Sequence, residues 1–228
     1  MMFFPLDSTL ILLIPAILLS IYAQFAIRSA YSKWSKVRSS LGMNGAQIAQ
    51  RLLQQNGIYD VEVEEVGGSL SDHYDSRAKK VRLSSDVYHS TSLAALSVAA
   101  HETGHAIQHA TSYGPLNIRQ SLFPIASFGT NWGIWIFLIG MFISSFSFLM
   151  DVGILLFAGA VIFQIVTLPV EFNASNRALA QLSTGGYLRT DEINGAKKVL
   201  NAAALTYVAA AALAVLHLVR LLILRGDE

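Results

Sequence analysis

The chain contains no cysteine among its 228 residues. This absence excludes disulfide bonds, CxxC zinc sites and thiol nucleophiles, although it does not fix the redox compartment. Charged residues are also scarce, at 14% of the chain, whereas they make up about a quarter of a soluble domain. The formal net charge of +1 gives no indication of nucleic-acid binding. With 53% hydrophobic residues, the composition indicates a membrane protein.

Four long apolar stretches predict membrane-spanning helices, because about 20 apolar residues cross a bilayer. They lie at 10–27, roughly 124–149, 152–170 and 202–224, with a turn expected at "MDVG" (150–153) between the second and the third. The first stretch lacks the basic start and the small-residue cleavage site of a signal peptide, so we expect a retained anchor.

Lysine and arginine are distributed unevenly along the chain. Residues 28–119 hold ten of the 16, residues 171–201 hold four more, and the N-terminus and the turn at 150–153 hold none. Because basic residues accumulate on the cytoplasmic side of a membrane, both polar segments are predicted to face the cytoplasm.

The first polar segment has the pattern of a small α+β unit. It predicts a helix at 44–57 ended by Gly57, a strand at 59–66, two short strands within 73–88, and a helix at 92–112. The expected fold is therefore mainly α, with about four transmembrane helices and a small cytoplasmic α+β unit. The predicted organisation is an anchor (1–27), a cytoplasmic unit (28–120), a transmembrane hairpin (121–170), a cytoplasmic helical segment (171–201) and a last transmembrane helix (202–228).

The segment "AAHETGHAIQH" (99–109) contains an H-E-x-x-H motif. On a helix, residues four apart share one face, so His101 and His105 can bind one metal ion. Glu102 is rotated by about 100° from His101, so it stands beside the ion, where it can take a proton from water. A purely structural pair of histidines is the alternative. Gly104 is expected to leave room beside the ion.

His109 continues the same face, but it lies about 12 Å along the helix axis from His101. A straight helix cannot bring all three imidazoles to one ion, and no glycine follows His105 to break the helix, as it does in metzincins. His109 is therefore expected on the helix surface or in contact with a ligand, not on the metal.

A third ligand must come from another helix. A hairpin returns the chain to the face it left, where "LPVEFNASNRALAQL" places Glu171 after a break at Pro169, in the first turn of a helix. Its alternative role is a favourable charge at a helix N-terminus. Two histidines and a carboxylate suit a single zinc ion best. The other carboxylates weighed as ligands, and found poorer, are Glu62, Glu64, Glu65, Asp151, Asp191 and Glu192.

Groups around the ligands are expected to orient the imidazoles. Ser175 lies four residues after Glu171 on the same face, and Asn173 is nearby. Arg177 is expected to pair with carboxylates or with substrate. Tyr207 is considered as an oxyanion donor, with a membrane-interface tyrosine as the alternative.

The stretches "SLSDHYDSRAKKVRLSSDVY", "AAHETGHAIQH" and "LPVEFNASNRAL" resemble the YugP-like family of prokaryotic membrane neutral zinc metallopeptidases, which is similar to the HtpX and CAAX prenyl protease gluzincins. The similarity runs over nearly the whole chain. It implies that His101, His105 and Glu171 are ligands and that Glu102 is the general base. Those gluzincins carry an acidic residue where Ser175 stands, so Ser175 is expected to be a weaker partner.

The "DHYD" segment (Asp72–Asp75) also belongs to the resemblance. A strand there could border the cleft and pair with an extended substrate. The leading hypothesis is a membrane-embedded zinc endopeptidase of the prokaryotic inner membrane with its active site on the cytoplasmic face. Its expected partners are a polypeptide substrate and membrane lipid, without nucleic acid, and membrane protein quality control is a suggested role. An inactive zinc-stabilised scaffold is the alternative. A metal transporter is less favoured, because the apolar run before His101 is only about eight residues, too short for a span.

Overall fold

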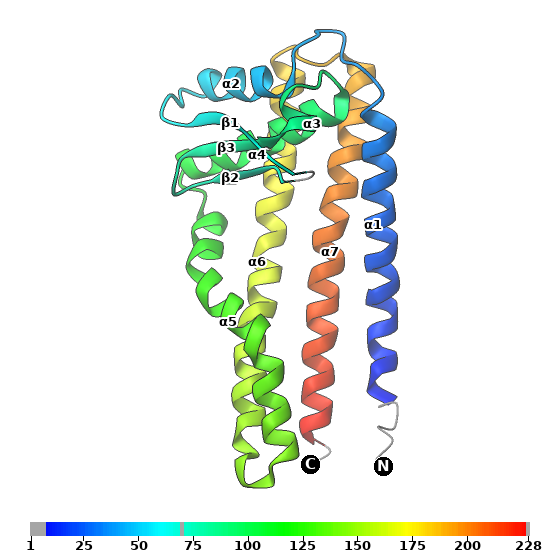
Figure 1. Ribbon diagram of the computed structural model, residues 1–228, viewed down its shortest axis with the longest axis vertical. Coiled ribbons are helices and arrows are strands. Elements are labelled where there is room, and N and C mark those ends of the chain that lie inside the picture. The colour runs from blue at the N-terminus through cyan, green and yellow to red at the C-terminus, as the bar shows by residue number, and fades with distance from the viewer. Residues whose placement is uncertain (1–7, 69–70, 227–228) are drawn as a thin grey trace. The chain divides into compact units, whose positions relative to one another are not determined.

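The computed structural model describes residues 8–68 and 71–226. Seven α-helices, two 3₁₀ turns and a three-stranded sheet make up the described chain (Figure 1). The helices are α1 (Ile14–Trp34), α2 (Gly45–Gln55), α3 (Ser85–Tyr88), α4 (Leu93–Ala110), α5 (Gly114–Phe142), α6 (Phe148–Thr184) and α7 (Thr190–Gly226). The strands are β1 (Glu62–Val66), β2 (His73–Asp75) and β3 (Lys80–Ser84), and the 3₁₀ turns are η1 (Ser8–Leu13) and η2 (Ser144–Phe146). The prediction of a mainly α membrane protein with a small sheet is confirmed.

The chain divides into two compact units, and α1, α5, α6 and α7 each have one part in each unit. The apolar unit comprises Met1–Ala23, Ile118–Leu168 and Thr206–Glu228, and the polar unit comprises Gln24–Asn117 and Pro169–Leu205. Four helices are long and apolar enough to cross a membrane: Thr9–Trp34, Gly114–Phe142, Phe148–Thr184 and Thr190–Gly226.

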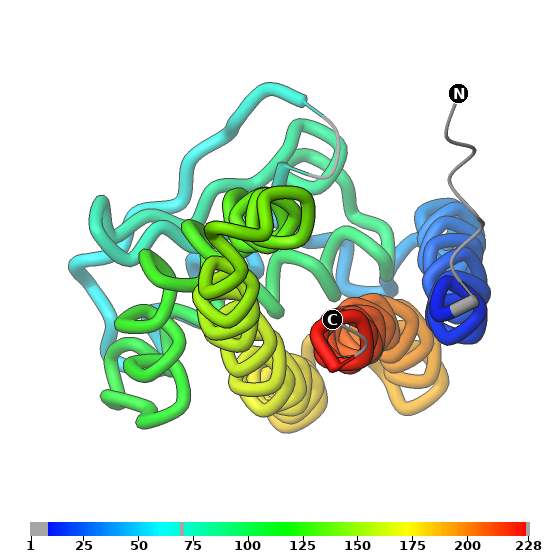
Figure 2. The backbone as a smooth tube through the Cα atoms, turned by 90° about the horizontal axis from the view of Figure 1, so that it is seen from below, coloured from blue at the N-terminus to red at the C-terminus, as the bar shows by residue number. Residues whose placement is uncertain are grey.

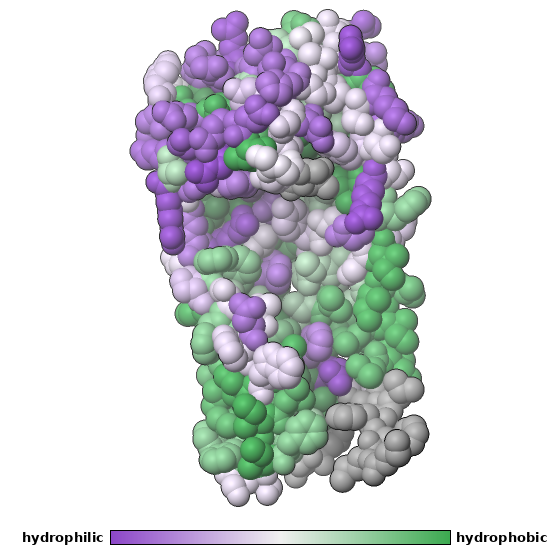
Figure 3. All heavy atoms as spheres, viewed as in Figure 1, coloured by the Kyte–Doolittle hydropathy of each residue, from purple (hydrophilic) through white to green (hydrophobic). Residues whose placement is uncertain are grey.

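In the apolar unit, α5 and α6 form an antiparallel hairpin (Figures 1 and 2). The two helices approach closely at glycines, since a Cβ on Gly153 would lie 2.6 Å from the carbonyl oxygen of Gly133. Phe137, Met150 and Leu221 belong to the buried cluster of this unit. Large apolar side chains stay exposed on α1 and on the hairpin (Figure 3). Such a surface suits contact with lipid acyl chains.

The hairpin turn lies earlier than predicted. Helix α5 ends at Phe142, a 3₁₀ turn spans Ser144–Phe146, and α6 begins at Phe148. The turn expected at 150–153 was therefore wrong. Asp151 stands in the first turn of α6, where a negative charge is favourable, and it accepts a hydrogen bond from Arg225 Nε at 2.9 Å.

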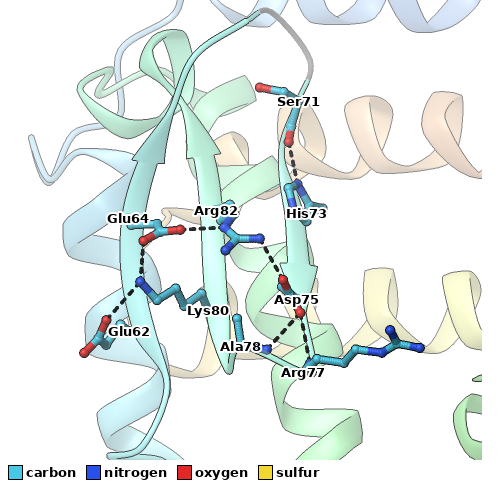
Figure 4. Close-up of polar contacts among 9 residues, drawn as sticks. All are labelled: Glu62, Glu64, Ser71, His73, Asp75, Arg77, Ala78, Lys80 and Arg82. Atoms are coloured by element: carbon cyan, nitrogen blue, oxygen red, sulfur yellow. Dashed lines mark hydrogen bonds and ion pairs between the residues drawn. The ribbon is translucent and has the colours of Figure 1, made fainter.

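The sheet of the polar unit has the order β1-β3-β2, with β1 parallel and β2 antiparallel to β3. Val81 and Leu83 of β3 are fully buried on one face. Charged residues cover the other face, where Lys80 Nζ lies 2.6 Å from Glu64 and Arg82 Nη1 lies 2.7 Å from Asp75 (Figure 4). Hydrogen bonds from Arg82 and Lys80 hold the pKa of the Glu64 carboxyl below its usual range. Apolar and charged residues thus alternate along β3, and this alternation fixes which face of the sheet packs inward.

Helix α4 is the centre of the polar unit because both of its sides are covered. One cluster joins it to α2, α6 and α7, with Leu96 and Leu182 among its members, and a second joins it to the sheet through Ala95 and Leu83. The Ser92 side chain caps the helix by accepting from the backbone N–H of Ala95 at 3.2 Å. Fourteen of the first sixteen residues of α4 are buried. A surface helix buries only one face, so this burial shows that α4 is an internal helix, and its many small side chains let the neighbouring elements pack closely on all sides.

Several predicted elements of the polar unit are confirmed. The helix expected at 44–57 is α2, with Asn44 and Gln47 forming a capping box and Gly57 following at φ +70°. The helix expected at 92–112 is α4. The break expected at Pro169 was wrong, because α6 continues through it to Thr184. Proline is tolerated inside long apolar helices, where neighbouring groups satisfy the freed carbonyl.

Candidate metal centre

Helices α4 and α6 come into backbone contact at Gly104. A Cβ at this position would lie 2.7 Å from the carbonyl oxygen of Ala174, a separation that real Cβ atoms do not show. Gly104 was expected to leave room for an ion, but its role here is to admit the backbone of α6. The close approach brings the residues on either side of Ala174, Glu171 and Ser175 among them, up to the histidine face of α4.

His101 and His105 of α4 meet Glu171 of α6. Their ligand atoms all lie within 4.8 Å of one another, and all three side chains are buried. Both imidazole Nε2 atoms converge on the same carboxylate oxygen, at 3.2 Å for His101 and 3.5 Å for His105. Among the described residues, no other group of three histidine, aspartate or glutamate side chains is gathered in this way. Two imidazoles and one carboxylate are a common donor set for catalytic zinc, so the residues fit that ion.

Glu171 is not in the first turn of a helix, as had been expected, but well inside α6. The role of a favourable charge at a helix N-terminus is therefore excluded. The residue is only 2% exposed. A carboxylate buried this deeply requires a positive partner, which the two imidazoles or a cation among them can provide.

The electrostatic field at the histidines favours positive charge. Burial by itself would lower the pKa of His105, but the hydrogen bond to Glu171 and the charges of Glu102 and Glu171 outweigh burial and raise that pKa. The same field favours a divalent cation at this position.

The outer nitrogens of both imidazoles are also engaged. Ser175 Oγ lies 3.1 Å from His101 Nδ1, and Gln108 Oε1 lies 3.0 Å from His105 Nδ1. The sequence reasoning had proposed Ser175 but had missed Gln108. The available signal was the spacing, because a residue three positions after His105 lies on the same side of the helix.

Glu102 occupies the side of α4 that reaches the surface. From Leu93 to Gln108 every residue is buried except Val98 and Glu102, which are half-buried. These two residues are one turn apart, so they form a narrow accessible stripe on an otherwise enclosed helix. Glu102 is adjacent to His101 in sequence but outside the ligand group. It is therefore the carboxylate of the motif that an incoming molecule can reach.

His109 lies outside the ligand group and contacts the sheet instead. Its Nδ1 is 2.8 Å from the hydroxyl of Tyr74 in β2. Burial, followed by the charges of Asp60 and Asp75, raises the pKa of Tyr74 to about 12, so the hydroxyl stays protonated. Both side chains line a hollow of about 240 Å³ beside Ala106 and Ala110.

The acidic residues of the "DHYD" segment hold its strand in place. Asp72 accepts from the backbone N–H of Ser84 at 2.8 Å. Asp75 accepts from the backbone N–H groups of Arg77 and Ala78 at 2.9 Å (Figure 4). Burial raises the pKa of Asp72, against the hydrogen bonds from Ser84. These contacts fix β2 as the edge strand next to β3.

The other carboxylates weighed as ligands are placed elsewhere. Glu64 pairs with Arg82, Glu65 accepts from Ser85, and Asp151 pairs with Arg225. Glu192 is buried near the start of α7, where it accepts from the backbone N–H of Ser40 at 2.6 Å and from that of Arg189 at 2.8 Å. Glu62 lies near Lys80, and Asp191 lies near Arg189.

Arg177 and Tyr207 occupy different surroundings. Arg177 Nε donates to Asn173 Oδ1 at 2.7 Å, and its guanidinium lies 6.0 Å from the centre of the Tyr113 ring. It thus contacts an amide and an aromatic ring, whereas a carboxylate or the substrate had been expected as its partner. Tyr207 is half-buried in α7 and belongs to the apolar unit, whereas the histidines and Glu171 belong to the polar unit.

Replacing Gly104 tests the close contact of the two helices. We expect Gly104→Ala to lower both the melting temperature and the zinc affinity, because the added methyl group must push α6 and Glu171 away from α4. Overpacking of this kind costs about 1–3 kcal/mol. Gly114→Ala is the matched control, since a Cβ there meets nothing within 4 Å. Thermal melts and zinc titrations that do not distinguish Gly104→Ala from the wild type would contradict this role.

Comparison with known proteins indicates a family of zinc-dependent membrane enzymes. A family model described as "Putative neutral zinc metallopeptidase" matches residues 9–226. The chain is 50% identical over 209 residues to "Putative membrane protease YugP" of Bacillus subtilis (strain 168), covering 92% of each protein. No solved structure matches the chain significantly.

Proposed function

Because the chain belongs to the family described as "Putative neutral zinc metallopeptidase", we propose that it is a membrane-embedded zinc endopeptidase. The observation that carries the proposal is the buried convergence of His101, His105 and Glu171 within 4.8 Å, with Glu102 beside it on the accessible stripe of α4. The three converging side chains would hold one zinc ion.

When bound, zinc supplies a Lewis acid that activates water and polarises the scissile carbonyl. Glu102 acts as the general base, because its carboxylate can accept the proton of a water molecule as the water oxygen bonds to the carbonyl carbon. The same carboxylic acid then passes its proton to the amide nitrogen as the C–N bond breaks. Peptide hydrolysis is thereby balanced without any further reactant.

The proposed substrate is a polypeptide in extended conformation. In the described sheet β2 has β3 as its only neighbour, so its other edge can pair with an added strand. The hollow lined by Tyr74 and His109 is also lined by Ala106, one helical turn after Glu102, and we propose that it takes a substrate side chain. Membrane protein quality control is a setting in which such a substrate would arise.

The proposed location is the inner membrane of a prokaryotic cell, with the active site on the cytoplasmic face. The four long apolar helices and the accumulation of lysine and arginine in 28–119 support this orientation. Helix α4 is not among the four helices that are both long and apolar enough to cross a membrane. This argues against a transporter, which would need its metal-binding motif inside a span.

Cleavage assays with metal removal test the proposed function. We expect the protein purified in detergent to cleave casein or an unfolded membrane protein, to lose this activity with 1,10-phenanthroline, and to regain it when zinc is added. Zinc bound at one equivalent without cleavage of any substrate would instead support an inactive scaffold. Zinc flux into liposomes without proteolysis would support a transporter.

A further inference from the structure

Gln108 is a fully buried polar side chain that the proposed chemistry does not use directly. It is 0% exposed, and it lies on α4 in contact with both His105 and α6. Its Oε1 is 3.0 Å from His105 Nδ1, and its Nε2 lies 2.8 Å from the carbonyl oxygen of Val170 and 3.0 Å from Asn173 Oδ1. Every polar atom of the amide therefore has a partner, as a buried amide requires.

The orientation of this amide follows from the chemistry of its partners. A backbone carbonyl can only accept, so the NH₂ group of Gln108 must face Val170. The second partner agrees, because Arg177 Nε, which can only donate, lies 2.7 Å from Asn173 Oδ1 and identifies that atom as an oxygen. The carbonyl oxygen of Gln108 is left facing His105. A flipped amide would place its oxygen against two other oxygens.

The fixed orientation of the Gln108 amide determines which ring nitrogen of His105 carries the proton. Because Gln108 Oε1 can only accept, the proton of neutral His105 must lie on Nδ1, which leaves the lone pair on Nε2. That Nε2 atom points at Glu171 Oε2, in the ligand group. The partner of His101 is less selective, because the hydroxyl of Ser175 can either donate or accept.

The same amide also fixes the third ligand. The carbonyl that Gln108 binds belongs to Val170, the residue immediately before Glu171. One side chain on α4 thus holds the ring of His105 and the backbone of α6 next to Glu171, across 62 positions of sequence. Partners of this kind normally set the orientation and basicity of metal-bound histidines.

We propose that Gln108 is a positioning residue of the metal centre, which sets His105 in the Nδ1–H tautomer and locks the α6 backbone beside Glu171 so that both present their ligand atoms to zinc. This role rests on the proposed zinc site. It does not depend on whether the protein cleaves peptides, so the two proposals can fail separately.

Gln108→Met tests the role, because methionine keeps the approximate volume and removes both hydrogen-bonding groups. We expect zinc affinity, measured by competition with a chromophoric chelator, to fall by about 10–100-fold, the usual effect of losing such a partner. The visible spectrum of the cobalt-substituted protein should also change, since the ligand field depends on ring orientation. Gln181→Met is the matched control, because Gln181 lies on α6 and its side-chain amide donates to Asn56 at 3.2 Å, outside the ligand group.

A measurement on the wild type keeps the test independent of folding defects. In the zinc-loaded protein with ¹⁵N-labelled histidine, His105 should bind through Nε2 and carry its proton on Nδ1. Binding through Nδ1, or unchanged zinc affinity in folded Gln108→Met, would overturn the role. Weakened zinc binding in Gln108→Met together with a wild type that cleaves nothing would support the role of Gln108 and refute the peptidase. A wild type that binds no zinc would refute both.

Discussion

Glu102→Gln is expected to abolish peptide cleavage while leaving zinc binding intact. The amide cannot accept the proton of water, and loss of a general base typically lowers the rate by about 10²–10⁴-fold. Zinc content should stay at one equivalent, because Glu102 is outside the group formed by His101, His105 and Glu171. The measurements are the initial rate of casein cleavage and the metal content of the same preparation.

Glu62→Gln is the matched control for this experiment. It makes the same chemical change in a glutamate whose side chain is 75% exposed on β1, so its cleavage rate should equal that of the wild type. Undiminished cleavage by Glu102→Gln, with Glu62→Gln also active, would contradict the assigned mechanism. Equal loss in both variants would show that the assay responds to charge or to expression instead of to the general base.

Glu171→Gln is expected to remove tight zinc binding. A neutral amide is a poor zinc ligand, so the loss should exceed the roughly 10–100-fold that follows from changing an outer partner of a ligand. Zinc at 100 times its dissociation constant stabilises a folded protein by about 2.7 kcal/mol. We therefore expect added zinc to raise the melting temperature of the wild type and to leave that of Glu171→Gln nearly unchanged. Metal content after dialysis against a chelator provides a second readout.

Glu192→Gln separates ligand loss from the loss of any buried carboxylate. Glu192 is also buried, but it accepts hydrogen bonds from Ser40 and Arg189 near the start of α7. This variant should melt at a lower temperature, since a helix-capping interaction contributes about 0.5–2 kcal/mol, and it should keep its zinc affinity. Tight zinc binding by Glu171→Gln would exclude Glu171 as a ligand.

Local patterns in the sequence predicted the elements around the site well. The apolar spacing and the glycine after α2, the alternation of β1, and the small-residue run of α4 each reflect interactions within a few residues. The H-E-x-x-H spacing places two histidines together for the same reason, because a helix brings i and i+4 onto one face.

The failures arose where a distant partner decides the local structure. Pro169 reads as a helix end in isolation, yet α6 continues through it within a long apolar helix. Asp151 suggested a turn, although it is in the first turn of α6 and pairs with Arg225 far along the chain. A short-range pattern carries no information about such contacts.

Gly104 and Gln108 show the same limit within the site. The glycine was noticed, but its neighbour proved to be the carbonyl of Ala174, on a helix that the spacing alone could not dock. Gln108 resembles any polar residue near the end of a helix until its contact with Val170 is seen. Tertiary packing therefore determines the outer contacts of a site whose motif is readable from sequence.

We propose that His101 and His105 of α4 and Glu171 of α6 hold one zinc ion. A crystal structure of the zinc-loaded protein, with anomalous diffraction recorded at the zinc edge, tests this directly. We expect one strong peak bonded to Nε2 of both histidines and to a carboxylate oxygen of Glu171. A peak bonded to His109 in place of Glu171, or no peak at these residues in a zinc-loaded crystal, would contradict it.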